Sequence, residues 1–236
     1  MSISRAKSEV KLTKRLAAAA AAVREGSRVA DVGCDHGMLA AWLVQCKKCA
    51  YAYAIDVSGP SLNKAADLFS SLGIVDKTAV MLSDGLAPVD PRLVDDVVIG
   101  GLGADTIEHI ISRAEWLKDE SKQLVLVPSS RHGRLRRFLC LEGFAILKET
   151  AVFEAGHAYT VMTVRYRGFR RVLSAAQAAF GEVLKSDGER AAYVRTVRRR
   201  CERIIQQATN AKDSSPSSAL QEAREIMAFI ETLEQK

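Results

Sequence analysis

The residues of this sequence that could do chemistry are the carboxylates and glycine of one short stretch, residues 28–39. Asp31 lies near the end of an apolar run, Gly33 follows it, and Asp35 lies two residues further on. An apolar run, a glycine, polar residues and a second apolar segment predict a buried strand, a tight turn and a helix. Gly33 would let the backbone turn and let a ligand approach closely, because it has no Cβ.

The spacing of the glycines indicates the kind of ligand. A dinucleotide fingerprint has the form G-x-G-x-x-G and binds pyrophosphate through backbone amides. Here Asp35 stands at the position of the second glycine, and its carboxylate would repel a pyrophosphate. The acidic turn favours S-adenosylmethionine, which carries a sulfonium and an ammonium group but no phosphate. The alternative is an ordinary turn between a strand and a helix.

Two further acids follow predicted strands. Asp56 ends the apolar run 50–55 and lies 23 residues beyond Gly33, close to the ~20-residue spacing of an acid that accepts from ribose hydroxyls. Asp84 follows the run 79–82 and could accept a hydrogen bond from an adenine amino group. Asp56 could instead be a turn or N-cap residue, and Asp84 part of an Asp-Gly turn. Three acids at three strand ends favour a nucleoside pocket, because ligands bind beyond the carboxyl ends of parallel strands.

Apolar runs alternate with helical spacings over residues 1–168, which we interpret as one domain. The expected strands are 29–32, 50–55, 78–82, 96–99 and 123–127, followed by a hairpin of 145–154 and 159–165. The expected helices are 11–23, 38–46, 60–72, 105–116 and 131–142. This order predicts an α/β fold, a doubly wound Rossmann-like sheet with an antiparallel edge, which is the plan of the class I methyltransferases.

Residues 169–236 predict a separate helical domain. Ser174 and Gln177 form a capping-box pattern, and residues 189–208 have apolar side chains at helical spacing. A polar linker, 212–218, leads to a second predicted helix in which apolar side chains have the same spacing. Together they predict an antiparallel, coiled-coil-like helical hairpin.

Composition excludes several classes of protein. The 236 residues suffice for one α/β domain and a small appendage. No apolar run reaches the ~18 residues of a transmembrane helix, and residues 1–14 lack the apolar core of a signal peptide. The five cysteines have no repeat pattern, and Cys46 and Cys49 form a lone C-x-x-C. We therefore expect reduced thiols, a cytoplasmic protein, no membrane and no metal.

Arginine is concentrated in the C-terminal half of a chain with formal charge +6 and pI near 9.1. Arg195, Arg199 and Arg203 are spaced so that they share one helix face. Because arginine suits phosphates and stacked bases, the clusters predict a nucleic-acid-binding face, although each alone could be a solvated surface. The clusters are 131, 134, 136 and 137; 165, 167, 170 and 171; and 195, 198, 199, 200 and 203.

The motifs resemble, along the whole chain, those of the bacterial tRNA (adenine-22-N1)-methyltransferases. Residues 31–39 are similar to the family's D-I-G-S-D-H-A-Y-L, residues 84–86 to its D-G-L, and residues 99–104 to its I-A-G-M-G-G. The D-x-G-x-D-H element is fairly specific, since most class I methyltransferases have glycine where Asp35 stands. The resemblance implies a cytoplasmic enzyme, a monomer or weak homodimer, that uses S-adenosylmethionine to methylate N1 of adenine 22 in tRNA.

The resemblance and the residue patterns together assign the expected site. Asp35 and His36 are the catalytic candidates, to orient the base or accept from its amino group, although His36 could instead satisfy loop backbone. The expected cofactor-binding residues are Asp31, Gly33, Cys34, Asp35, Asp56, Val57, Asp84, Gly85, Gly100 and Gly101. The expected RNA contacts are Arg131, Arg134, Arg136, Arg195, Arg199 and Arg203.

The chain departs from the family pattern around the expected target base. Leu102 replaces a methionine, Ala104 replaces a glycine, and residues 127–130 differ from the usual Q-P-N. These departures leave open the methylation of a different RNA base, or an RNA-binding protein with little catalysis. A nicotinamide-dependent oxidoreductase would share the sheet, but the missing second glycine argues against it.

Overall fold

The computed structural model describes residues 10–186, 188–210 and 217–235. Its centre is a seven-stranded sheet with the order β3-β2-β1-β4-β5-β7-β6. The five parallel strands are β1 (Ser27–Val32), β2 (Cys49–Asp56), β3 (Thr78–Leu82), β4 (Asp96–Gly100) and β5 (Gln123–Val127). β6 (Phe144–Glu154) and β7 (His157–Tyr166) form an antiparallel hairpin whose β7 pairs with β5. The predicted doubly wound sheet with an antiparallel edge is confirmed.

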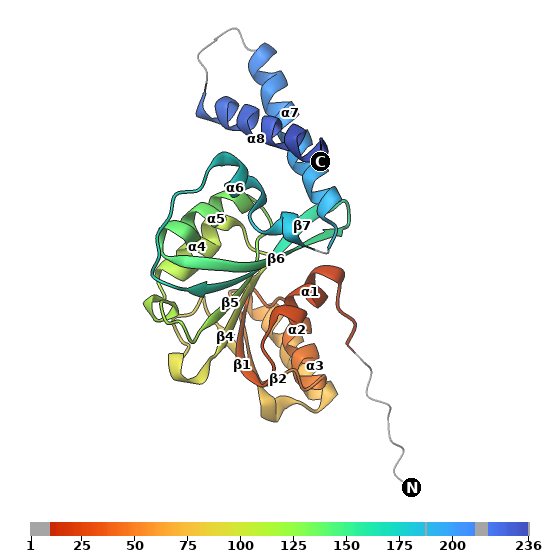
Figure 1. The fold of residues 1–236 in the computed structure, drawn as a ribbon. Helices are drawn as coiled ribbons and strands as arrows, with labels where there is room; N and C mark the ends of the chain where they lie inside the picture. Colours follow the sequence, from red (N-terminus) through yellow and green to blue (C-terminus); the bar gives the residue numbers. More distant parts are fainter. Residues whose placement is uncertain (1–9, 187, 211–216, 236) are drawn as a thin grey trace.

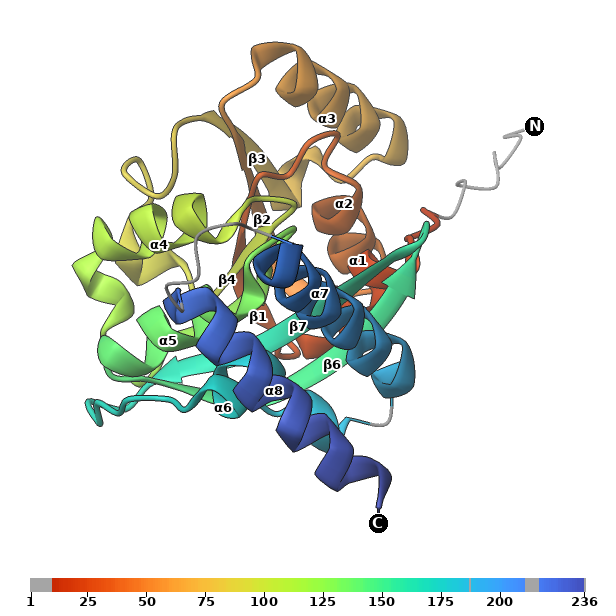
Figure 2. The ribbon, with the colours of Figure 1, turned by 90° about the horizontal axis from the view of Figure 1, so that it is seen from above.

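Helices cover both faces of the sheet, as Figures 1 and 2 show. On one face lie α1 (Lys14–Ala22), α2 (Met38–Gln45) and α3 (Gly59–Leu72), and on the other α4 (Ala104–Ser112) and α5 (His132–Leu141). Each face therefore has its own apolar core, one with α1–α3 and one with α4 and α5. Burial of the central strands on both sides explains their nearly continuous apolar sequence.

Local signals fix where the helices begin and end. The Ser58 hydroxyl accepts from the Ser61 N–H, Pro60 lies in the first turn of α3, and Gly73 ends this helix in the left-handed conformation. The helix predicted over 105–116 is shorter: α4 ends at Ser112, and a 3-10 turn, Glu115–Leu117, follows. The chain turns there because Leu117 is drawn into the core, where it is 1% exposed.

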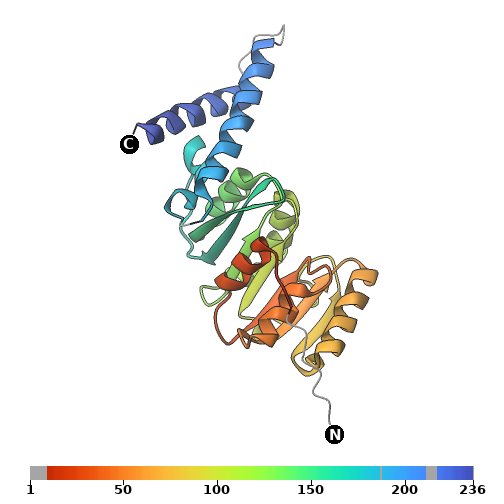
Figure 3. The same cartoon turned by 90° about the vertical axis from the view of Figure 1, so that its right-hand side faces the viewer.

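The C-terminal part comprises α6 (Ala175–Phe180), α7 (Arg190–Asn210) and α8 (Ser218–Glu234). The predicted capping box of Ser174 and Gln177 is present at the start of α6. Figures 1 and 3 show α7 and α8 extending beyond the sheet and crossing at an angle. The two helices pack against each other through a shared apolar cluster and an ion pair between Arg198 and Glu234. Their apolar cluster includes Ala151 of β6, which joins them to the sheet. Most of the predicted linker 212–218 lies outside the described residues.

Candidate active site

A cavity of about 350 Å³ opens at the carboxyl ends of the parallel strands, and we call it the strand-end cavity. It is bordered by the ends of β1, β2, β4 and β5 and by α1. Eight of the predicted site residues line it: Asp31, Gly33, Cys34, Asp35, His36, Asp56, Gly100 and Gly101. This is the position where parallel α/β sheets bind ligands.

Asp31 is a buried carboxyl group in this cavity and lacks a full set of partners. The residue is 4% exposed, and its Oδ2 atom has no hydrogen-bond partner among the described residues. Burial raises the pKa of Asp31 to about 7, and the negative charge of Asp56 also raises it, whereas a hydrogen bond from the Ala40 backbone opposes the shift. A buried carboxyl group in this state gains most from a ligand that brings a positive charge.

Gly33 lets the turn after β1 approach the end of β4. Its φ is +73°, and a Cβ at this position would lie 2.8 Å from the carbonyl oxygen of Gly100. Gly101 also has a positive φ, +76°, but no atom lies within 4 Å of its would-be Cβ. Glycine is therefore required at position 33 both by the positive φ and by the lack of room for a Cβ. At position 101 it is required by the positive φ alone.

Asp56 organises the acidic turn as well as lining the cavity. Its Oδ2 accepts from the Asp35 N–H at 3.0 Å, and its Oδ1 accepts from the Ser58 N–H at 2.9 Å. Asp35 itself has a φ of +49°, which few residues other than glycine adopt. The alternative interpretation of Asp56 as a turn residue is therefore correct in part, and its role toward a ribose stays a prediction.

Asp35 and His36 present polar groups at the mouth of the cavity. The Asp35 Oδ1 atom lies 3.3 Å from His36 Nε2 and 3.4 Å from the Ser61 hydroxyl. Lys64 of α3 places its Nζ atom 3.2 Å from the same His36 nitrogen. The side chains of Asp35 and His36 are 73% and 45% exposed, so both are accessible to a substrate. Sequence reasoning missed Lys64, which gives no signal beyond its place in a predicted helix.

Arg15 is a second residue that the sequence analysis missed. It extends from α1 and lines the strand-end cavity, with its guanidinium carbon 5.0 Å from the centre of the Tyr159 ring. Its Nε lies 4.0 Å from Glu154 Oε2, and this buried nitrogen has no hydrogen-bond partner among the described residues. The sequence signal that could have identified Arg15 is its position at the N-terminal end of an alanine-rich helical segment.

Three predicted cofactor residues do not line this cavity. Asp84 is exposed and borders a separate hollow of about 210 Å³ with Arg113 and Trp116. Gly85 packs against Ile110, where a Cβ would lie 3.3 Å from Ile110 Cγ1. Val57, next to Asp56, is 67% exposed, which is unusual for an apolar side chain. Their contacts with a cofactor stay predictions.

Five of the six arginines predicted to contact RNA are exposed. Arg195, Arg199 and Arg203 project from α7 with no ion pair to any residue that the structure describes. Arg131 and Arg134 are bound by carboxylates of α4, at 2.6 Å from Asp105 and, for Arg134, 3.0 Å from Glu108. Their positive charges are thus partly neutralised.

The prediction that Arg136 contacts RNA is wrong, because this side chain is fully buried. Its Nε and Nη2 atoms donate to Glu149 Oε1 at 3.0 and 2.9 Å, and Nη1 donates to the carbonyl oxygens of Ala178 and Ala179 at 2.8 Å each. The Tyr193 hydroxyl lies 3.1 Å from Nη2. Arg136 therefore joins α5, β6, α6 and α7, a role that its place in an arginine-rich helix did not indicate.

The part of the chain that the structure describes offers neither a cluster of metal ligands nor a membrane-spanning helix. Within residues 10–186, 188–210 and 217–235, no three His, Cys, Asp or Glu side chains gather as metal ligands. Cys46 is exposed and Cys49 is buried, each as a free thiol. No helix in the same ranges is long and apolar enough to cross a membrane.

Comparison with known proteins agrees with this geometry. A family model described as a methyltransferase domain matches residues 12–162. The tRNA (adenine(22)-N(1))-methyltransferase of Bacillus subtilis is 30% identical over 155 residues, which are 65% of each chain. A putative tRNA methyltransferase of Mycoplasma pneumoniae is 35% identical over 57% of this chain and 61% of its own. These alignments thus span less than two thirds of the curated relatives.

Solved structures match over a longer range. The Bacillus subtilis m1A22 tRNA methyltransferase TrmK superimposes with a TM-score of 0.79 and 25% identity, over 96% of this chain and 99% of its own. A Streptococcus pneumoniae protein assigned to the same reaction, crystallised with S-adenosyl-L-methionine, has a TM-score of 0.78 and 26% identity, over 92% and 100%. The chain belongs to the family of methyltransferase domains, and its predicted likeness to the tRNA (adenine-22-N1)-methyltransferases is confirmed.

Proposed function

We propose that this protein uses S-adenosylmethionine to methylate N1 of an adenine, at position 22, in tRNA. The observation that carries the proposal is the buried carboxyl group of Asp31, whose Oδ2 atom has no partner among the described residues, beside the close backbone approach at Gly33. Such a group fits the positive charges of this cofactor and disfavours a pyrophosphate. The relatives with this reaction in their names support the choice of substrate.

The residues of the strand-end cavity fit the chemical groups of the cofactor. When bound, S-adenosylmethionine supplies an electrophilic methyl group. Asp31 would attract its ammonium group, and Asp56 would accept from its ribose hydroxyls. Arg15, with a buried nitrogen lacking a hydrogen-bond partner among the described residues, would donate to its carboxylate. Val57 and Asp84 would border its adenine.

The chain's own contribution to catalysis is mainly positioning. Adenine N1 has a free electron pair at neutral pH, so its attack needs no prior loss of a proton. Holding the reacting atoms in line can supply up to ~10 kcal/mol of the barrier. The exposed carboxylate of Asp35 would accept from the adenine amino group, where positive charge develops on methylation. His36, held between Asp35 and Lys64, would orient the base.

We further propose that residues 169–236 form a domain that holds the tRNA next to residues 1–168. Arg195, Arg199 and Arg203 are exposed on α7 and free of ion pairs to the described residues, so phosphates could bind them. We also propose that the protein is cytoplasmic, where its tRNA substrate would be, and that it is a monomer or a weak homodimer.

The experiment is methyl transfer to unmodified tRNA with labelled S-adenosylmethionine, followed by digestion and mass analysis of the nucleosides. The expected product is 1-methyladenosine. Asp35→Asn should lower kcat at least tenfold and leave the KM of the cofactor within twofold. Label in guanosine or cytidine, or in protein alone, would contradict the substrate. Tight NAD binding with no response to S-adenosylmethionine would contradict the cofactor.

The RNA-holding role is tested by changing Arg195, Arg199 and Arg203 together to Glu. Each lost phosphate contact should reduce the dependence of log affinity on log salt by about one unit, so binding should be weaker and its salt slope flatter. Cofactor binding, measured in parallel, should stay unchanged because all its residues lie before residue 169. Full tRNA affinity in a folded variant would instead favour arginines that are merely solvated.

A further inference from the structure

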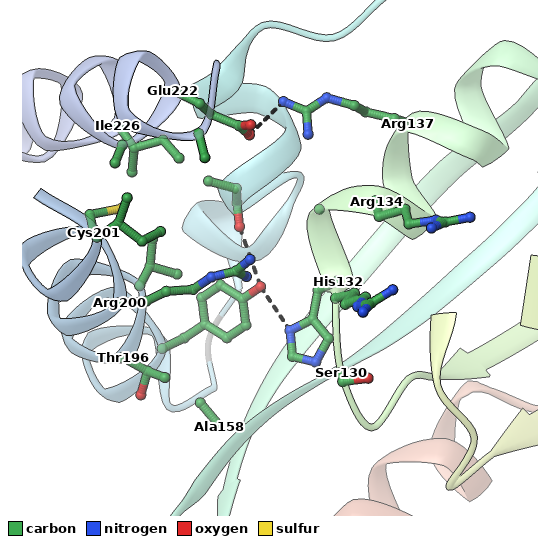
Figure 4. Close-up of a pocket in the computed structure, with 18 of the residues that line it drawn as sticks. Ser130, His132, Arg134, Arg137, Ala158, Thr196, Arg200, Cys201, Glu222 and Ile226 are labelled. Atoms are coloured by element: carbon green, nitrogen blue, oxygen red, sulfur yellow. Dashed lines mark hydrogen bonds and ion pairs between the residues drawn. The ribbon is translucent and has the colours of Figure 1, made fainter. Parts of the chain in front are cut away.

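A second cavity, larger than the strand-end cavity, lies between the C-terminal helices and the start of α5 (Figure 4). We call it the hairpin cleft. It has a volume of about 470 Å³ and is lined by α5, α7, α8 and the loop after β5. This volume lies within the range of sites that bind small ligands or a single nucleotide. Nothing in the cofactor chemistry above uses it.

Part of the lining of the hairpin cleft is apolar and consists of small side chains, which we call the alanine floor. Ala158 of β7, Ala179 of α6, and Ala219 and Ala223 of α8 contribute to it, and Ile226 of α8 adds a larger apolar side chain. Because alanine side chains are short, they leave a space that a flat ring system can enter. A surface of this kind binds a base by contact and gives little preference for its hydrogen-bonding edge.

One wall of the cleft is formed by two aromatic rings in fixed positions. His132 and Tyr193 stack with ring centres 5.8 Å apart and 21° between their planes, and His132 Nδ1 lies 3.1 Å from the Tyr193 hydroxyl. The buried Arg136 holds that hydroxyl from behind at 3.1 Å. Burial is the main cause that lowers the pKa of His132 to about 4, and the charges of Arg136 and Arg200 add to it. His132 is therefore a neutral ring at physiological pH.

Arg200 supplies an unpaired positive charge at the cleft. The other lining arginines are matched by carboxylates: Arg131 by Asp105, Arg134 by Glu108 and Arg137 by Glu222. Arg200 is exposed, and the described residues offer it neither a hydrogen bond nor an ion pair. Figure 4 shows its guanidinium extending from α7 toward His132 of α5. An unpaired arginine beside an apolar slot suits an anionic group attached to a flat ring.

The hairpin cleft and the strand-end cavity share a wall. Leu102 lines the strand-end cavity, and its carbonyl oxygen accepts from the N–H of Ser129, which lines the hairpin cleft. On the same loop, Ser130 Oγ lies 3.5 Å from the position of a Cβ on Gly103. An RNA chain with its target base at the mouth of the strand-end cavity, beside Asp35 and His36, would therefore have the hairpin cleft next to it.

We propose that the hairpin cleft binds one unpaired nucleotide of the RNA next to the target adenine, with its base on the alanine floor and its phosphate on Arg200. The proposal rests on the proposed function and extends it, because it gives the enzyme a second, sequence-tolerant contact beside the reacting base. Extruding a base costs a few kcal/mol, and a neighbouring nucleotide held in this way would help to offset that cost.

The test uses adenosine 5′-monophosphate as a probe, in the presence of saturating S-adenosylhomocysteine so that the strand-end cavity is filled. Calorimetry on the full chain should show one site. Arg200→Ala should weaken binding at least tenfold, whereas Arg199→Ala, on the same helix but outside the cleft, should change it less than twofold. Adenosine and inorganic phosphate should each bind at least tenfold more weakly than the nucleotide.

A second variant fills the hairpin cleft with a large side chain and so tests the proposal without changing any charge. Ala219→Trp, at an exposed position of the lining, should abolish nucleotide binding while the protein keeps its unfolding midpoint. Absence of nucleotide binding in the wild-type protein, or equal binding by Arg200→Ala, would overturn the proposal. With tRNA as substrate, Arg200→Ala should raise the KM of tRNA at least fivefold more than Arg199→Ala does. If tRNA is methylated but no nucleotide binds, only the cleft proposal fails, and the reverse result rejects only the proposed function.

Discussion

Asp31 and Arg136 are both ionisable side chains in the interior of the protein, but they differ in how completely other groups of the protein bind them. Arg136 is 0% exposed and is bound by a carboxylate, two backbone carbonyl oxygens and a tyrosine hydroxyl. Asp31 is 4% exposed, and one of its oxygens has no partner among the described residues. Arg136 sits at a junction of four elements, whereas Asp31 sits in a cavity.

The difference separates a structural charge from a functional one. A buried ion whose hydrogen-bonding capacity is filled within the protein stabilises the arrangement of the elements that fill it. A buried carboxyl group left short of partners lowers the stability of the free protein and is explained by a ligand. Burial of an ionisable group therefore does not by itself distinguish a structural role from a functional one. The distinction depends on whether the protein fills all of the hydrogen-bonding capacity of that group.

The largest expected effect is on stability, from breaking the Arg136 junction. Arg136→Met leaves Glu149 buried without its cation, so the free energy of unfolding should fall by roughly 3–5 kcal/mol, measured by urea denaturation. Arg137→Met removes an exposed pair with Glu222 and should cost no more than about 1 kcal/mol. Equal stability of Arg136→Met and the wild type would show that the junction does not hold the C-terminal helices.

The opposite effect is expected at Asp31. Its pKa is about 7 in the folded protein, against an ordinary value of 3.8, so between these values the folded state holds a proton that the unfolded state has lost. Stability should therefore fall as the pH rises from 4 to 7, by up to roughly 4 kcal/mol. Asp31→Asn removes this loss, so the cofactor-free variant should gain on the wild type by roughly 2–4 kcal/mol between pH 4 and pH 8.

Urea denaturation at several pH values measures this effect. Asp96 is the matched position: burial raises its pKa as well, but Arg24 donates to both of its carboxylate oxygens and opposes that shift, so Asp96→Asn should gain clearly less than Asp31→Asn at pH 8. A stability difference between Asp31→Asn and wild type that does not vary with pH would show that the Asp31 carboxyl group has an ordinary pKa.

A smaller effect is expected in the backbone of the strand-end cavity. Gly33→Ala places a Cβ 2.8 Å from the Gly100 carbonyl oxygen in a left-handed conformation, and should cost about 2–3 kcal/mol and weaken cofactor binding. Gly101→Ala has the same kind of φ but open space, so it should cost about 1 kcal/mol. Thermal unfolding compares the two, and equal effects would mean that the close approach at Gly33 is not required.

Most of the fold could be predicted from the sequence because local and tertiary preferences agree there. The strand 78–82 was predicted with its observed bounds, since β-branched and apolar residues end at a turn. The helix 60–72 was predicted to within one residue by its proline and glycine signals. Asp31 and Asp56 could be predicted to lie together, because the topology of parallel strands brings their ends together, whereas Asp84 borders a separate hollow.

What could not be predicted depends on long-range contacts. Arg136 lies in the same arginine-rich segment as Arg134 and Arg137, and only its position on the inner face of α5 separates a buried pair from exposed ones. Arg15 lies in α1 and Asp31 in the next element, β1, and only the folded structure brings both side chains to one cavity. The hairpin cleft arises from the angle at which the helices pack. The spacing of apolar residues in the sequence does not specify this angle.

The central claim is that Asp31 is an unpaired buried acid that a positively charged cofactor completes, and proton release tests it most directly. S-adenosylmethionine binding is measured calorimetrically at pH 6 in buffers of different ionisation enthalpy. With a pKa of about 7, Asp31 is mostly protonated in the free protein at this pH, and binding should ionise it. We expect the wild type to release close to one proton and Asp31→Asn to release none and to bind more weakly. Equal proton release by both proteins, with equal affinity, would contradict the central claim.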